Sequence, residues 1–147
     1  GKSSKIIFAD LKETIQKINQ EKKIEIVYCF SRRTPQSLKN NILKSKKKRS
    51  FVFPDNFCNP YWELINIADY IFVTADSISM TSDALSTGKP TYIIPVSKIK
   101  SKIKNFQMNL NKEKITRIYN KKLSKWSYKK LEESKLVGKQ LKQILKL

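Results

Sequence analysis

The sequence of 147 residues contains no histidine and only two cysteines, Cys29 and Cys58. The absence of histidine excludes a serine–histidine triad and removes the side chain that most often acts as a general base near neutral pH. Two cysteines without histidine supply neither a disulfide framework nor a zinc site. We therefore expect no metal and no cofactor, and a reducing, cytoplasmic compartment.

Long apolar runs are also missing. No stretch is apolar over the roughly 20 residues that a membrane-spanning helix needs, and no charged-then-apolar signal peptide opens the chain. The length fits one α/β domain with a core of its own and does not fit two. Because the first residue is Gly1 rather than methionine, we expect a cut, a processed end or a remnant of cloning there.

Acidic residues are scarce: 12 Asp and Glu stand against 31 Lys and Arg, for a net charge of +19. Such a charge suits binding to the phosphates of nucleic acid or of an anionic lipid surface. The alternative, favoured by the even spread of the basic residues, is that lysine simply fills surface positions. The one dense run, Lys44–Arg49, is expected to form a solvated turn. Nucleic acid is the weakest partner class, because no readout motif accompanies the diffuse charge.

Helices and strands are expected to alternate along the chain. Runs rich in β-branched and aromatic residues predict strands at 24–30, 50–53, 69–74 and 91–95. Helical spacing and capping residues predict helices at about 10–22, 35–43, 60–67 and 77–87, then polar helical segments, the last at about 128–145. This order favours an α/β fold with a parallel sheet and helices on both faces, which binds ligands at the carboxyl ends of its strands.

The segment from Ala68 to Pro95 contains the strongest candidate site. A strand that ends at Thr74 is followed by a small polar turn and a helix. The N-terminus of a helix has unpaired N–H groups and partial positive charge, so it can hold an anion. Asp83, one turn further on, can accept hydrogen bonds from a ribose diol. The alternative is structural, because serine and aspartate are also common in the first turn of a helix, where they cap it. The local pattern favours neither explanation over the other. Hydroxyls that could donate to a phosphate belong to Ser77, Ser79, Thr81 and Ser82.

Two basic segments are further candidates. Arg32 and Arg33 follow a strand at the same expected sheet edge, and guanidinium groups bind phosphate oxygens in pairs. The opening Gly1–Lys5 offers hydroxyls and a lysine but lacks the spacing of a P-loop. The alternative for both is a solvated turn in a very basic protein. Four aromatic residues that could stack on bases are more simply packing residues of amphipathic helices: Tyr61, Trp62, Trp126 and Tyr128.

The strings SRRTP, NPY and ADYIFVTADSISMTSDALSTGKPTYIIP together resemble the mitochondrial-fission Elm family of plants and bacteria. The likeness is specific between about Ser31 and Pro95, looser from Gly1, and not apparent beyond about Lys100. The family looks like a GT-B glycosyltransferase, in which two Rossmann-like domains face a cleft and the C-terminal one holds the sugar nucleotide. The resemblance implies that residues 1–147 form a single domain of this nucleotide-sugar-binding type, without the N-terminal domain and the first strand.

The resemblance also assigns residues. It places the diphosphate near Ser77, Ser79, Met80 and Thr81, with Arg32 and Arg33 beside it, the ribose diol at Asp83, and Ser4 and Lys5 in a turn after the domain's first strand. When complete, such a protein would be an inverting, metal-independent glycosyltransferase whose acceptor site and base lie in the missing domain. The implied partners are a nucleoside diphosphate sugar and that domain. The alternative is a non-catalytic module at an anionic membrane surface or on another protein, which the charge and an amphipathic C-terminal helix favour.

Overall fold

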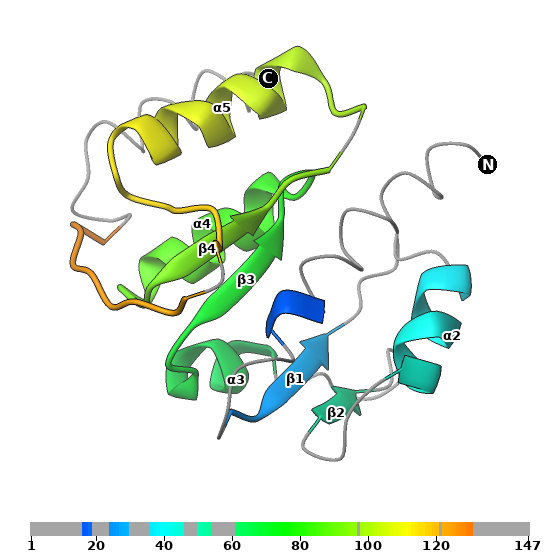
Figure 1. Cartoon of the computed structure of the whole chain (residues 1–147). Helices are drawn as coiled ribbons and strands as arrows, with labels where there is room; N and C mark the ends of the chain where they lie inside the picture. Colours follow the sequence, from blue (N-terminus) through cyan, green and yellow to red (C-terminus); the bar gives the residue numbers. More distant parts are fainter. Residues whose placement is uncertain are drawn as a thin grey trace.

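The computed structural model describes residues 16–18, 24–29, 36–45, 50–53, 61–96, 98–120 and 122–130. Within them strands and helices alternate, as predicted (Figure 1). Each strand lies inside its predicted range, because β-branched runs and turn residues define strands locally. The elements are β1 (Ile26–Cys29), α2 (Gln36–Ser45), β2 (Ser50–Phe53), α3 (Tyr61–Ile67), β3 (Ile71–Thr74), α4 (Ile78–Ser86), β4 (Thr91–Ile94) and α5 (Ser101–Lys112).

The first and last predicted helices lie mostly outside the described residues. Residues 16–18 are helical, in agreement with the helix expected at 10–22. Residues 128–130 are not helical, so the expected start of the last helix is wrong. The hydroxyl of Tyr128 instead donates to the Lys89 carbonyl, and its ring packs against the cluster around Phe106. Trp126 also lies outside any helix and donates from Nε1 to the Ile115 carbonyl at 3.0 Å.

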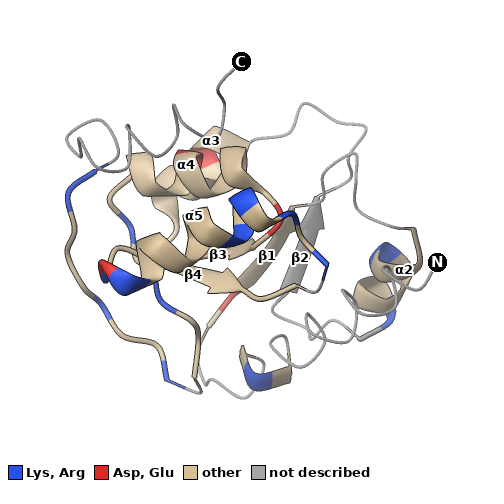
Figure 2. Cartoon of the chain, turned by 90° about the horizontal axis from the view of Figure 1, so that it is seen from above, with Lys and Arg blue, Asp and Glu red and all other residues tan. Residues whose placement is uncertain are grey.

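The strands run parallel, as predicted, but they form two pairs rather than one continuous sheet. β1 pairs with β2 from Ile26–Ser50 to Cys29–Phe53, and β3 pairs with β4 from Ile71–Thr91 to Thr74–Ile94. Among the described strands, no ladder joins β1 to β3. Both views show the order β2, β1, β3, β4 across the layer (Figures 1 and 2). The α/β class is therefore confirmed, and the expectation of one sheet is corrected for this part of the chain.

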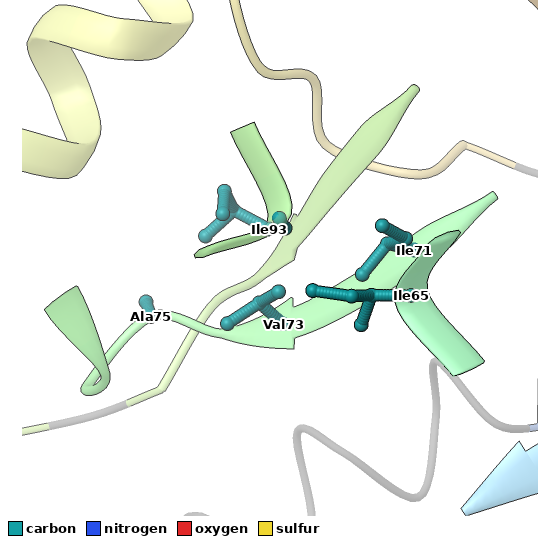
Figure 3. Packing of buried hydrophobic residues seen from close by; sticks show 6 residues of the cluster. Ile65, Ile71, Val73, Ala75 and Ile93 are labelled. Atoms are coloured by element: carbon teal, nitrogen blue, oxygen red, sulfur yellow. The ribbon is translucent and has the colours of Figure 1, made fainter. Parts of the chain in front are cut away.

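Helices cover both faces of the strands, because successive side chains alternate between faces. On one face, β3 and β4 pack against α3 and α4 (Figure 3). On the other face, Phe72 and Ile94 meet α2, and Tyr92 packs on Ile18. α5 lies against α4 through Phe106 and Leu110. The first of these clusters contains Ile65, Ile71, Val73, Ala75, Ala84 and Ile93.

α4 ends at the predicted glycine. Gly88 has φ +76°, in the left-handed region that favours glycine, and its N–H donates to the Leu85 carbonyl at 3.3 Å. The chain then turns into β4 within a few residues. Beyond the core, Lys and Arg lie on α2, α5 and the segment after α5 rather than on one element (Figure 2). None of the described helices is long and apolar enough to cross a bilayer.

Candidate functional site

The turn between β3 and α4 lies at the carboxyl end of the strands. Ala75 extends the pairing of β3 by donating its N–H to the Ile94 carbonyl at 2.9 Å. Ser77 is the N-cap of α4: its backbone is extended, and its side chain accepts from the Met80 N–H at 3.2 Å. The cap that the sequence predicts is therefore present. The start of α4 lies at the edge where parallel α/β sheets bind ligands.

Hydrogen bonds within the protein fix the first turn of α4. Ser77 is only 3 % exposed, and Thr81 is fully buried. The Thr81 hydroxyl donates to the Ser77 carbonyl at 2.7 Å and accepts from Gln107 Nε2 at 3.1 Å. Gln107 Nε2 also donates to the Ala75 carbonyl at 3.0 Å. The hydroxyls of Ser77 and Thr81 thus take part in the internal structure of the turn.

The remaining groups at the helix start differ in what they offer a ligand. Ser82 donates its hydroxyl to the Ile78 carbonyl at 2.8 Å, and Met80 is partly buried against the core cluster of Figure 3. Ser79 is exposed. The first backbone hydrogen bond within the helix runs from the Thr81 N–H to the Ser77 carbonyl. The N–H groups of Ile78 and Ser79 come before it and so have no partner within the helix. These two N–H groups and the Ser79 hydroxyl are the donors that could bind an anion at this helix start.

Asp83 is held by a tyrosine from the preceding helix. Tyr61, the first residue of α3, donates its hydroxyl to Asp83 Oδ2 at 3.1 Å. Burial raises the pKa of Tyr61, and the Asp83 charge, the hydrogen bond and the Cys29 thiol raise this pKa further. Tyr61 is therefore a donor at neutral pH, and it orients the carboxylate while leaving acceptor positions free.

Asp76 and Gln107 place unpaired polar atoms at this turn that the sequence did not indicate. Asp76 Oδ1 is buried and has no hydrogen-bond partner among the described residues, and the same is true of Gln107 Oε1. An acceptor buried in this way costs about 1–3 kcal/mol, so a donor from a ligand would stabilise it. Asp76 belongs to a turn rich in small polar residues, where aspartate is common, so its presence there does not by itself indicate a site. Gln107 comes from a helix 32 residues after Ala75, a contact that no local pattern predicts.

A cavity of about 450 Å³ lies beside this turn, between α5 and the end of β4. Its wall includes Ala75 and Gln107 of the network described above, together with Ile93 and Val96. Lys98 and Lys104 also contribute to the wall, and both are exposed. The cavity therefore combines an apolar wall with positive charge, close to the start of α4.

Four predicted site residues lie outside the described residues: Ser4, Lys5, Arg32 and Arg33. Their assignment remains a prediction. Within the described part of the chain, no group of three or more Cys, Asp and Glu side chains could hold a metal ion. Cys29 is half-buried in β1, where burial raises the pKa of its thiol.

Parallel strands that alternate with helices, and a capped helix that starts at their carboxyl ends, define an α/β protein with a sheet edge of the ligand-binding type. The model of the family described as Mitochondrial fission ELM1 matches residues 4–145, so the chain belongs to that family. The match supports the resemblance found in the motifs, and it extends well past Lys100, where no likeness was apparent.

Two relatives illustrate the extent of the match. An uncharacterized protein of Rickettsia prowazekii (strain Madrid E) is 40% identical over 151 residues, which cover 97% of this chain and 42% of that protein. The mitochondrial fission protein ELM1 of Arabidopsis thaliana is 32% identical over 110 residues, which cover 71% of this chain and 26% of that protein. The chain thus spans less than half the length of these relatives. No solved structure matches the chain.

Proposed function

We propose that the chain binds the diphosphate and ribose of a nucleoside diphosphate sugar at the start of α4. It would act as the donor-binding part of a GT-B-type, glycosyltransferase-like protein of the ELM1 family. The observation that supports this proposal most is the capped start of α4 at the carboxyl end of β3, with Asp83 held in place one turn behind it.

The diphosphate would lie at the helix start. The N–H groups of Ile78 and Ser79 point along the helix axis, where the macrodipole contributes a partial charge of about +0.5. The exposed Ser79 hydroxyl adds a donor. Arg32 and Arg33 follow β1, whose arrow points the same way as that of β3 in Figure 1, so we expect them at the same edge of the layer. Guanidinium groups there would neutralise the charge that develops on a leaving diphosphate without a metal.

The ribose would lie on Asp83. Residues four apart in a helix share a face, with Cβ atoms about 5–6 Å apart, so Ser79 and Asp83 can contact neighbouring groups of one ligand. Tyr61 occupies one position on Asp83 Oδ2 and leaves Oδ1 as an acceptor for a diol. The acceptor substrate and its general base would belong to the part of the protein that the 147 residues do not span.

Calorimetry with nucleoside diphosphates and their sugars tests this proposal. We expect Asp83→Asn to weaken binding at least about tenfold, or 1.4 kcal/mol, because a carboxylate accepts two hydrogen bonds from a diol and an amide only one. Asp69→Asn is the matched control, because Asp69 is exposed and precedes the opposite end of β3. Equal affinities of the two variants, or no binding of any nucleoside diphosphate by the unmodified chain, would refute the proposal.

The second candidate is a module that binds an anionic membrane surface, for which the net charge of +19 is the supporting observation. The apolar side of α5 is occupied, because Phe106 and Leu110 pack against α4. Such binding would therefore be electrostatic rather than by insertion of α5. Flotation with liposomes containing phosphatidylserine, compared with phosphatidylcholine alone, would show preference for the anionic lipid, and equal association with both would exclude it.

A further inference from the structure

The cavity between α5 and the end of β4 contains two buried oxygen atoms without a partner. They are Oε1 of Gln107, on α5, and Oγ1 of Thr116, in the segment after α5. Both residues line the cavity of about 450 Å³, and Gln107 is 6 % exposed while Thr116 is fully buried. Because buried polar atoms in proteins are nearly always hydrogen-bonded, two unpaired ones in a single cavity indicate that a bound molecule pairs them.

The side-chain amide of Gln107 can only accept a hydrogen bond from a ligand. Its Nε2 donates to the Ala75 carbonyl at 3.0 Å and to the Thr81 hydroxyl at 3.1 Å, which uses both N–H groups. Turning the amide over would bring Oε1 against the Ala75 carbonyl, so these two acceptors fix its orientation. A molecule that pairs Oε1 must therefore present a hydroxyl or an N–H group.

The position of Thr116 is set by backbone contacts on either side of it. The next residue, Arg117, forms a parallel bridge with Tyr92, and its carbonyl accepts from the Ile93 N–H at 2.8 Å. The Thr116 N–H donates to the Leu110 carbonyl of α5 at 3.3 Å. Figure 1 shows the segment after α5 passing along β4. Thr116 is thus held in place without its hydroxyl, which remains available to a ligand as donor or acceptor.

The rest of the wall narrows the kind of ligand. Ile93, Val96 and Ile99 form an apolar surface that suits the C–H face of a ring, and the volume lies within the range of about 300–1,000 Å³ of small-molecule sites. Lys98 and Lys104 add positive charge, and the described residues of the wall include no acidic side chain. An aliphatic anion would match the apolar wall and the charge, but it would leave both buried oxygens unpaired. A hydroxylated ring with an anionic group satisfies all of these features.

We propose that this cavity binds a sugar that carries an anionic group, either a sugar acid or a sugar phosphate. One hydroxyl donates to Gln107 Oε1, a second pairs with the Thr116 hydroxyl, and the carboxylate or phosphate lies toward Lys98 and Lys104. None of the described residues assigned to the diphosphate and the ribose lines this cavity. The inference therefore does not depend on nucleotide binding at the start of α4.

NMR titration of the 147-residue chain measures the binding. We expect a Kd of about 1 mM for glucuronate or glucose 6-phosphate, an affinity in keeping with so small a ligand. Glucose, which lacks the anion, and hexanoate, which lacks the hydroxyls, should each bind at least about threefold more weakly. Binding of only one anionic sugar would identify the anion as carboxylate or phosphate. No shift changes with either at about 20 mM, or equal binding of glucose or hexanoate, would overturn the proposal.

Two fully buried threonines separate a binding role from a structural one. Thr116→Val removes an unpaired oxygen, so the urea midpoint should not fall, whereas the affinity for the anionic sugar should fall about three- to tenfold. Thr91→Val, at the opposite end of β4, removes a donor to the Lys89 carbonyl, so it should lower the midpoint and leave the affinity unchanged. Lys104→Gln should weaken binding about two- to fivefold, and Lys102→Gln, an equal change of charge on α5 outside the wall, should not. Unchanged affinity in Thr116→Val, or equal affinities within either pair of variants, would overturn the proposal.

Discussion

Removing the hydroxyl of Tyr61 tests whether the orientation of Asp83 depends on α3. The Tyr61→Phe variant keeps the ring, which packs against the core cluster of Figure 3, and removes only the donor to Asp83 Oδ2. Hydrogen bonds to charged groups contribute about 1.5–3 kcal/mol when fully buried. Because this pair is only partly buried, we expect the free energy of unfolding to fall by about 1 kcal/mol. Urea-induced unfolding, followed by circular dichroism, measures the change.

The same variant should weaken nucleotide binding. Without its donor, the Asp83 carboxylate is free to rotate. The entropy lost when the ligand orders this side chain then lowers the affinity. We expect a three- to tenfold loss of affinity for a nucleoside diphosphate, about 0.6–1.4 kcal/mol, by calorimetry. Tyr70→Phe is the control, because the Tyr70 ring packs on Tyr92 and its hydroxyl has no hydrogen bond to the described residues. If Tyr61→Phe matched this control in both stability and affinity, α3 would have no part in the site.

Two further variants test the packing around the start of α4. Gln107→Glu should lower the free energy of unfolding by about 3 kcal/mol or more, because it buries a charge and replaces the donor to the Ala75 carbonyl and Thr81 by an acceptor. Gln107→Met loses the same donor but also removes the unpaired Oε1. Its free energy of unfolding, measured with urea, should therefore stay within about 1–2 kcal/mol of that of the unmodified chain. Burial raises the pKa of Tyr128 from 10.0 to about 12, so its contribution to stability is complete below pH 10 and is lost as the pH rises toward 12. Tyr128→Phe should therefore lose less stability than the unmodified chain between pH 9 and pH 11, and an identical loss in both proteins would contradict this explanation.

Local signals in the sequence predicted the elements well, because they depend on neighbouring residues. Ser77 caps α4 and Gly88 ends it, as their residue types indicated. Contacts between distant residues could not be read in this way. The bond between Tyr61 and Asp83 joins residues 22 apart, and the sequence indicated Tyr61 as a packing residue, or as a ring that stacks on a base, but not as a partner of Asp83.

The segment after α5 shows the same limit for aromatic residues. Trp126 was expected on an amphipathic helix, but it packs edge-on against Tyr92 with centroids 5.1 Å apart, and Arg117 lies 4.4 Å over its ring. These contacts join the segment to β4. Its backbone therefore follows a path that the spacing of apolar residues along the sequence does not predict. Strand periodicity alone predicted one sheet, whereas the described strands form two pairs. The one sequence signal that bears on this split is the first strand that the resemblance implied to be missing.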